Sequence, residues 1–260
     1  MIDLAIIDSF RTISLKDMGK VKLMNRIDTK YVTTLDKIIE LLKILSGNYL
    51  IQQIEGRSNM PYYTKYFDTP DVQMFYQHQR GKMNRQKVRI RLYEDCNTPP
   101  FIEIKTKSNK GRTKKKRVAM EPGSELFHYD NFFNLFSQYD PVSLIPQIEN
   151  HFYRITLINK EMTERITIDT NLEFHNFITD KALSLDNIGI IEWKRDGHNG
   201  RSDFEDILRS LKIQPSGFSK YCIGMAGTNP ELRQNRLKPK LRMIKRLASA
   251  SRKDVNTDNL

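Results

Sequence analysis

The sequence predicts an α+β fold that is dominated by antiparallel strands. Three observations lead to this expectation. Several segments alternate charged and aliphatic residues with a period of two, turn residues separate many of these segments, and a few others repeat their apolar residues at helical spacing. Hydrophobic residues make up 38% of the 260 residues. This is enough apolar material for a folded core, so a wholly disordered basic chain is excluded.

The strands are predicted from the alternating segments. Asn97-Thr98-Pro99-Pro100 and Asn109-Lys110-Gly111 are turn signals between consecutive segments. The seven predicted strands cover residues 62–67, 87–93, 101–107, 113–120, 151–158, 165–170 and 190–195. Strands separated by such turns indicate antiparallel pairing.

The helices are predicted from amphipathic spacing. Apolar residues recur at helical spacing between residues 33 and 47, and again after Ser202, which is a favourable residue for capping a helix. The apolar positions of these two helices are Ile38, Leu41, Leu42, Leu45, Phe204, Ile207, Leu208 and Leu211. A third helix is expected over residues 124–139.

The composition changes after Gly227, where basic residues become frequent and acidic residues rare. Leu237, Leu241, Ile244 and Leu247 fall on one helical face of this tail, so a basic amphipathic helix is expected. We therefore divide the chain into a domain over residues 1–227 and a basic tail over residues 228–260. The tail is either a solvated segment or a docking element for a membrane surface, a polyanion or a partner protein.

The net charge is strongly positive, since 43 Lys and Arg residues against 31 Asp and Glu residues give +12. A polyanionic partner is expected: nucleic acid, an acidic membrane surface or a phosphate chain. No run approaches the roughly 18 to 20 apolar residues of a membrane span, and Asp3 stands where a secretory signal carries positive charge. Cys96 and Cys222 form no CxxC pair, so neither a disulfide framework nor a zinc finger is expected. A cytoplasmic location is predicted.

Charge and aliphatic side chains alternate most clearly in the segment 87–93. Lys87, Arg89 and Arg91 share one face, opposite the aliphatic residues that follow each of them. One interpretation is a half-buried strand with its charges in water; the other is a helix-covered barrel whose charged face lines a hydrated lumen. Such a lumen would concentrate positive potential and admit a linear phosphate chain, whereas a nucleic-acid duplex is too wide.

Carboxylates stand among these cations, including Glu103 and Glu192. They suit a divalent metal ion that bridges phosphate oxygens during phosphoryl transfer. The chain contains no GxxxxGK[ST] loop, no GxGxxG after a strand, no HExxH and no GxSxG. A P-loop, a dinucleotide-binding loop, a zinc protease site and a serine hydrolase site are therefore not expected.

A series of short motifs occurs in the order typical of one known family. The motifs are Leu23-Met24-Asn25-Arg26-Ile27-Asp28-Thr29-Lys30-Tyr31, Tyr66-Phe67-Asp68-Thr69, Lys87-Val88-Arg89-Ile90-Arg91, Phe101-Ile102-Glu103-Ile104-Lys105, Gly111-Arg112-Thr113, Arg165-Ile166-Thr167-Ile168-Asp169, Ile191-Glu192-Trp193-Lys194 and Phe218-Ser219-Lys220-Tyr221. In these motifs and in their order, the chain resembles the VTC (vacuolar transporter chaperone) polyphosphate polymerase domain in its free-standing bacterial form. That domain is a branch of the triphosphate tunnel metalloenzyme (CYTH-like) superfamily.

The resemblance implies an eight-stranded antiparallel β-barrel, surrounded by helices, whose basic tunnel binds ATP and inorganic polyphosphate. The catalytic residues that it implies are Lys30, Arg89, Arg91, Lys105, Arg165 and Lys220. The substrate-binding residues are Arg85, Lys115, Arg117, Arg154, Lys194 and Ser219. Glu192 falls at the metal-binding glutamate, with Mn²⁺ or Mg²⁺ as the ion, and Glu103 is either a second metal ligand or part of a cross-strand salt bridge.

The predicted function is a polyphosphate polymerase that transfers the γ-phosphate of ATP to a growing chain. A tripolyphosphatase or an RNA or nucleoside triphosphatase of the same fold is one alternative, and a non-enzymatic binder of polyanions or nucleic acid is another. The tunnel hydrolases open with Glu-x-Glu-x-Lys, whereas this chain has Arg26-x-Asp28-x-Lys30. The lost carboxylate favours the polymerase, and nucleic acid is not the partner we expect. Gly217 stands where some polymerases carry a further lysine.

Overall fold

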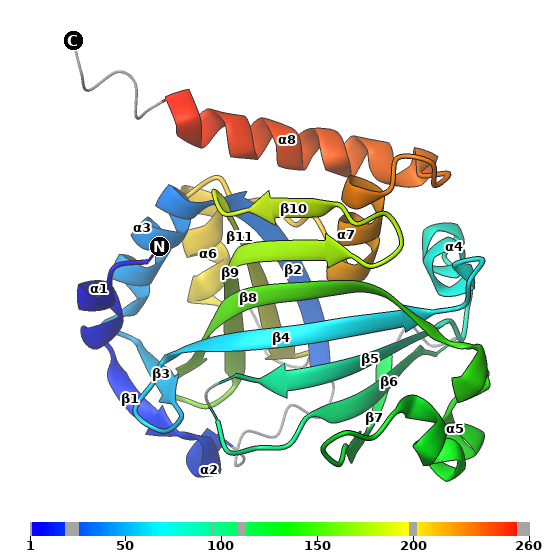
Figure 1. Cartoon of the computed structure of the whole chain (residues 1–260). Coiled ribbons are helices and arrows are strands. Elements are labelled where there is room, and N and C mark those ends of the chain that lie inside the picture. Colours follow the sequence, from blue (N-terminus) through cyan, green and yellow to red (C-terminus); the bar gives the residue numbers. More distant parts are fainter. Residues whose placement is uncertain (1, 19–25, 95, 109–112, 198–201, 254–260) are drawn as a thin grey trace.

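The computed structural model of the chain describes residues 2–18, 26–94, 96–108, 113–197 and 202–253. The described strands join in an 11-stranded sheet (Figure 1). Its main path runs, in the order of hydrogen-bonded neighbours, through β2 (Arg26–Thr34), β11 (Ile188–Asp196), β9 (Glu164–Asn176), β8 (Ile145–Asn159), β4 (Asn59–Asp68), β5 (Gln86–Tyr93), β6 (Phe101–Lys107) and β7 (Thr113–Ala119). Neighbours on this path are antiparallel, which confirms the predicted fold class. The first residues of the opening motif, 23–25, and the turn at 109–112 lie outside the described residues.

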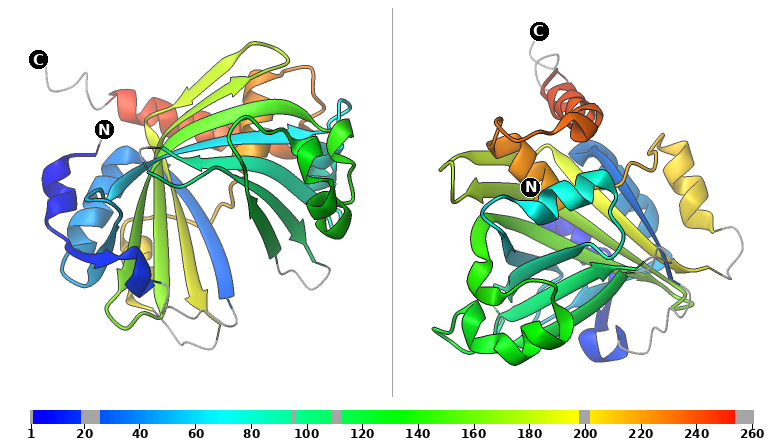
Figure 2. Two further views of the ribbon diagram at one scale, coloured as in Figure 1. Left: turned by 60° about the horizontal axis from the view of Figure 1, so that its bottom comes forward. Right: turned by 90° about the vertical axis from the view of Figure 1, so that its right-hand side faces the viewer.

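The expected closed barrel of eight strands is not found. β2 and β7 stand at the two ends of the path, and no strand pairing joins them in the described part of the chain. Residues 113–117 of β7 are exposed and mostly basic, which is typical of an edge strand that avoids further pairing. Figure 2 nevertheless shows a strongly curved sheet that wraps around its interior face. Register shifts between Tyr66 and Phe67 in β4 and between His151 and Tyr153 in β8 contribute to this curvature, because a bulge bends a strand and increases its twist.

β2 is not among the seven predicted strands, and neither are three short strands that extend the sheet. The three short strands are β1 (Arg11–Ser14), β3 (Tyr49–Gln53) and β10 (Ala182–Leu185). β3 pairs with β8 and with β1, in parallel with the latter, and β10 pairs with β9. Two of these strands have only four residues, too few to show a period.

Helices cover the outer face of the curved sheet. α3 (Leu35–Leu45) and α6 (Asp203–Ser210) bury their apolar residues against strand residues such as Ile166, Ile168 and Ile191. These strand residues are the aliphatic positions of the predicted alternation, so the charged positions between them point to the interior face. The remaining short helices are α1 (Leu4–Asp8), α2 (Leu15–Met18), α4 (Gln73–Arg80), η1 (Leu126–Tyr129), α5 (Asp130–Phe136), η2 (Pro141–Ser143) and η3 (Asn235–Leu237). The helix expected over 124–139 is thus shorter and begins as a 3₁₀ turn.

Two C-terminal helices complete the fold. α7 (Lys220–Thr228) lies close to β8 and β9, because a side chain at Gly224 would place its Cβ only 2.5 Å from a ring carbon of Phe174. α8 (Lys238–Lys253) is the helix expected in the basic tail, and it buries Ile244 and packs Leu241 and Leu247 against the core. Among the described residues, no helix combines the length and the apolar character that crossing a membrane requires.

Candidate functional site

The cross-strand register builds two rows of charge across β5, β6 and β7. These rows are Arg89–Glu103–Arg117 and Lys87–Lys105–Lys115. On the far side of the sheet the register sets Lys30 beside Glu192 and Arg154 beside Asp169. Charges that the sequence spreads over more than a hundred residues are therefore brought onto one interior face.

The two sides of this face look toward each other. Four strands separate β6 from β11 along the path of the sheet. Even so, the charge of Glu192 on β11 acts on Lys105 of β6, and the charge of Lys30 on β2 acts on Lys87 of β5. Because these strands are far apart along the sheet, such interactions indicate that its curvature brings the two charged sides near each other across the interior.

One side of the interior carries cations that are paired with carboxylates. Glu192 accepts Lys30 Nζ at 2.5 Å on one oxygen and Lys194 Nζ at 2.8 Å on the other. Burial alone would raise the pKa of Glu192, but Lys194 and Lys30 outweigh burial and hold that pKa well below its usual range. Glu192 is therefore an ionised carboxylate at neutral pH.

Asp169 forms a second set of ion pairs on the same side. Arg154 donates its Nε to one oxygen of Asp169 at 2.5 Å and an Nη to the other at 2.7 Å, and Lys220 from α7 also pairs with this carboxylate. Burial opposes ionisation of Asp169, yet Arg154 and Lys220 keep its pKa below the usual range. The Lys220 ammonium also lies 3.7 Å from the centre of the Phe152 ring. We call the cations Lys30, Lys194, Arg154 and Lys220, with Glu192 and Asp169, the paired wall.

Glu103 holds two cations on the opposite side. Arg89 donates to one of its oxygens from Nε at 2.7 Å and also from an Nη, and Lys115 Nζ lies 3.1 Å from the other oxygen. The side chain is almost fully buried, with the residue 1% exposed. Burial raises its pKa, but Arg89 and Arg91 overcome this and keep Glu103 ionised. This arrangement is the cross-strand salt bridge that the sequence left as one alternative.

Next to this salt bridge lie cations that have no carboxylate partner among the residues that the structure describes. Arg91 is 8% exposed and its Nε has no hydrogen-bond partner, while its guanidinium lies over the Tyr62 ring. Among the described residues, the Lys105 ammonium forms no ion pair, and Arg89 together with burial holds its pKa well below the usual value. Lys87 donates to Ser219 Oγ at 2.8 Å. We call Lys87, Arg91 and Lys105 the open wall.

The other predicted site residues lie toward the margins of this face. Arg85 donates to the backbone oxygen of Lys82 at 2.9 Å, and Arg117 is exposed, with its guanidinium over the Phe101 ring. Arg165 is half-buried and pairs in register with Lys194. Ser219 caps α7 by accepting from Cys222 N and also accepts from Lys87, so it fixes where α7 meets the open wall.

Three charged residues of the interior were not predicted as site residues. Lys87 shares the charged face of the segment 87–93, but it was not singled out as a ligand-binding residue. Asp169 lies on the charged face of its alternating strand, but only the fold reveals that it joins Arg154 to Lys220. Lys240 comes from α8, beyond the predicted domain, and its Nζ would lie 3.4 Å from a Cβ added to Gly217. No local sequence signal links residue 240 to this site.

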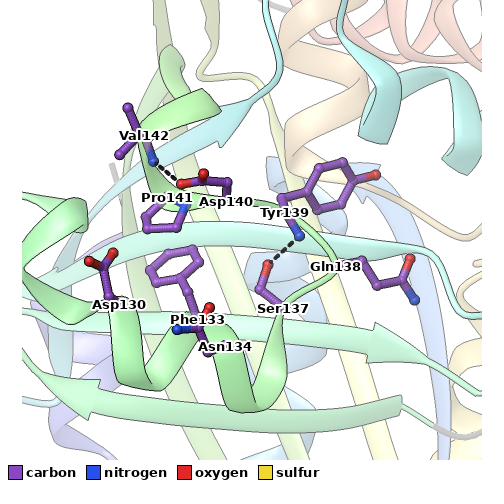
Figure 3. A pocket seen from close by; sticks show the side chains of 9 residues that line it. All are labelled: Asp130, Phe133, Asn134, Ser137, Gln138, Tyr139, Asp140, Pro141 and Val142. Atoms are coloured by element: carbon purple, nitrogen blue, oxygen red, sulfur yellow. Dashed lines mark hydrogen bonds between the residues drawn. The ribbon is translucent and has the colours of Figure 1, made fainter.

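Two cavities flank the region. One, of about 390 Å³, is lined by Asp28, Lys30, His78, Arg85, Lys107, Gly217, Phe218, Ser219, Cys222, Ile223, Leu237 and Lys240. The other, of about 470 Å³, lies beside α5 and carries Asp130 and Asp140 but no cation (Figure 3). The larger cavity therefore lacks the charge that binds phosphate, and the smaller one has it.

The inward carboxylates do not form a closed metal site. Both oxygens of Glu103 and both oxygens of Glu192 already contact cations, and no cluster of three His, Cys, Asp or Glu side chains suited to a metal occurs in the part of the chain that the structure describes. Glu192 keeps 19% of its side chain exposed, against 2% for Glu103. A metal ion held by protein ligands alone does not fit, whereas an ion that enters with phosphate needs only one or two carboxylates.

Comparison with known families agrees with this geometry. The family model of the VTC domain matches residues 25–229. This match covers most of the 260 residues, so the chain belongs to the VTC domain family. Membership supports an enzyme whose function relates to polyphosphate or triphosphate. The comparison with curated proteins gave no match.

Solved structures of low similarity share parts of the arrangement. A putative adenylyl cyclase from Hippeastrum, described as having a dominant triphosphatase activity, is 15% identical, with a TM-score of 0.46 over 78% of this chain and 96% of its own. A putative adenylate cyclase from Vibrio parahaemolyticus is 10% identical, with a TM-score of 0.44 over 76% of this chain and 96% of its own. A Pyrococcus horikoshii protein is 14% identical, with a TM-score of 0.44 over 77% of this chain and 99% of its own.

Proposed function

We propose that the chain is a polyphosphate polymerase, which transfers the γ-phosphate of ATP to the end of an inorganic polyphosphate chain on the interior face of the sheet. The observation that carries the proposal is the open wall. Arg91 and Lys105 are inward cations that have no carboxylate partner in the described part of the chain, and unpaired charge in a partly dry site is costly. A phosphate chain would neutralise both cations at once.

The reaction needs little covalent help from the protein. The bond between the γ-phosphorus and the oxygen that bridges it to the β-phosphate breaks, and a bond to a terminal oxygen of the chain forms, so that ADP leaves. Such a transfer depends on in-line positioning and on neutralising the charge of the transferred group. Arg89, Arg91 and Arg154 supply forked donors, and Lys105 and Lys220 supply compact charges. No serine or cysteine nucleophile is required.

Glu192 would hold a divalent ion, Mn²⁺ or Mg²⁺. When bound, the ion would supply positive charge that offsets part of the charge on the phosphates. Glu192 is the more suitable carboxylate because it keeps solvent access and sits on the paired wall, where phosphate could displace Lys30 or Lys194. Glu103 as a second ligand stays a prediction, and so does a cytoplasmic location.

Incubation with ATP and Mn²⁺ tests the proposal, with polyphosphate measured on a gel and released phosphate measured in the same reaction. Long chains are the expected product. Phosphate without chains would instead establish a triphosphatase. If neither product forms although long polyphosphate or nucleic acid binds with a steep salt dependence, the chain is a polyanion binder.

The variant Glu192→Gln separates catalysis from binding. It removes the carboxylate that meets the ion, so we expect metal-dependent turnover to fall at least about 100-fold. Because one negative charge is lost, affinity for tripolyphosphate should stay the same or increase. Glu173→Gln, on an exposed position of β9, is the matched control and should keep full activity. Normal turnover by Glu192→Gln would contradict the assigned role.

A further inference from the structure

The basic cavity of about 390 Å³ extends beyond the two walls. It lies between β2, α4, α7 and α8. Among the described residues, four cations line it, Lys30, Arg85, Lys107 and Lys240, together with one carboxylate, that of Asp28. Positive side chains in a concave space focus potential far more than the same charges on an open surface.

Two polar groups of the cavity residues have no charged or hydrogen-bonding partner in the part of the chain that the structure describes. In the described part of the chain Lys240 has no ion pair, and it is partly buried, which lowers the pKa of its ammonium. Nδ1 of His78 is buried and has no hydrogen-bond partner. Burial, with help from Lys87 and Arg85, lowers the pKa of His78 to about 3, so its ring is neutral at physiological pH. A neutral ring still offers one N–H donor to an anion.

The cavity is continuous with the interior face. Lys30 lines the cavity and also pairs with Glu192 at 2.5 Å on the paired wall. Ser219 lines the cavity and accepts from Lys87 of the open wall at 2.8 Å. The cavity and the interior face therefore share Lys30 and Ser219 at their boundary.

We propose that this cavity is a second phosphate subsite, which binds an outer phosphate of a long inorganic polyphosphate chain, and that Lys240 of α8 is its chain-binding residue. The substrate class rests on the proposed function. The subsite gives the C-terminal helix a definite role: its apolar side packs on the core, and its first turn adds a cation to the path of the chain.

Chain length is the variable that tests the subsite. Binding of tripolyphosphate and of long-chain polyphosphate is measured calorimetrically, without nucleotide or metal, for the wild type and for Lys240→Met. We expect the variant to bind the long chain about tenfold more weakly, as loss of one charge-assisted hydrogen bond implies. Its affinity for tripolyphosphate should change less than twofold.

Lys245→Met is the matched control, because Lys245 is exposed on the same helix and the change in net charge is identical. It should bind both ligands like the wild type. Three results would overturn the subsite. Lys240→Met and Lys245→Met could change the affinities equally, or Lys240→Met could lose affinity for both ligands to the same extent. The wild type could also bind the long chain no more tightly than tripolyphosphate. Unchanged melting temperatures would verify that both variants fold.

The subsite and the proposed function can fail separately. A protein that shows the Lys240 effect in binding but makes no polyphosphate from ATP would contradict the polymerase and leave the subsite in place. Normal synthesis without any Lys240 effect would overturn the subsite alone.

Discussion

The paired wall and the open wall both place cations on the interior face, but they differ in whether a carboxylate of the protein neutralises the charge. On the paired wall, Glu192 and Asp169 each hold two cations within the folded protein. On the open wall, Arg91 and Lys105 have no carboxylate in the described part of the chain, and Lys87 contacts only a hydroxyl. The ion pairs of the paired wall therefore stabilise the fold, whereas the cations of the open wall are left to pair with a bound anion.

The difference indicates how the site is pre-organised. Ion pairs fix the guanidinium of Arg154 and the ammonium of Lys220 before substrate arrives. These two side chains therefore lose little conformational entropy when a substrate binds. The unpaired cations add the larger gain in affinity, because an entering phosphate does not have to displace a carboxylate from them. A mutation in the paired wall should therefore mainly lower the stability of the fold, whereas a mutation in the open wall should mainly lower the affinity for phosphate.

Asp169→Asn should have the largest effect, and it should be an effect on stability. The substitution leaves Arg154 and Lys220 buried near each other without their anion, so the free energy of unfolding should fall by about 3 to 5 kcal/mol. Urea denaturation measures this loss. Tripolyphosphate should raise the melting temperature of this variant more than that of the wild type, because a bound anion replaces the missing charge.

Asp186→Asn, on an exposed residue of the turn before β11, is the control and should unfold like the wild type. An Asp169→Asn protein as stable as the wild type would show that the paired wall does not stabilise the fold.

Arg91→Met should show the opposite signature. Removing an unpaired, 8% exposed guanidinium should leave the free energy of unfolding unchanged or higher. Affinity for tripolyphosphate should fall about 10- to 100-fold, since hydrogen bonds to charged groups contribute about 1.5 to 3 kcal/mol. Calorimetric titration and urea denaturation of the same preparation provide both values. A variant that loses stability but keeps its affinity would reverse our assignment of the two walls.

The pH dependence of binding should be smaller and should come from the paired wall. Burial lowers the pKa of Lys220 to about 7 against the opposing effect of Asp169, and it lowers the pKa of Lys194 to about 8 against Glu192. Both side chains are charged below these values and lose their proton above them, so affinity for tripolyphosphate should decline as pH rises through 7 to 8. The expected decline is about tenfold per pH unit for each group that must regain its proton.

The ligand also titrates, so the wild type is compared with Lys220→Arg across the same pH range. The arginine keeps its charge, and the ratio of the two affinities should change only through Lys220. A constant ratio would rule out titration of Lys220 in this range.

Much of the fold was predicted from the spacing of charged and apolar residues along the sequence. Alternation in segments such as 87–93 predicted both the strands and the face that carries charge, and apolar spacing predicted α3 and α6. Closure of the sheet was not predictable in this way, because it depends on whether the exposed, basic strand β7 finds a partner at the far edge. The short strands β1 and β10 carry too few residues for a periodic signal.

The sequence predicted most of the cations of the site, but it did not predict which carboxylate each of them pairs with. The motifs identified Arg89, Glu103 and Lys105, but the sequence could not decide between a metal ligand and a salt bridge for Glu103. The structure shows Glu103 in a cross-strand salt bridge with Arg89 and Lys115, and its further role as a metal ligand stays a prediction. Lys240 could not be predicted, since only the packing of α8 brings it next to Gly217.

The most direct test is an experimental structure of the protein with tripolyphosphate bound. Our interpretation predicts phosphate oxygens about 3 Å from the Arg91 guanidinium and from Lys105 Nζ, on the interior face of the sheet. Tripolyphosphate bound in the acidic cavity beside α5 or on the exposed basic side of α8, with Arg91 and Lys105 left uncontacted, would contradict it.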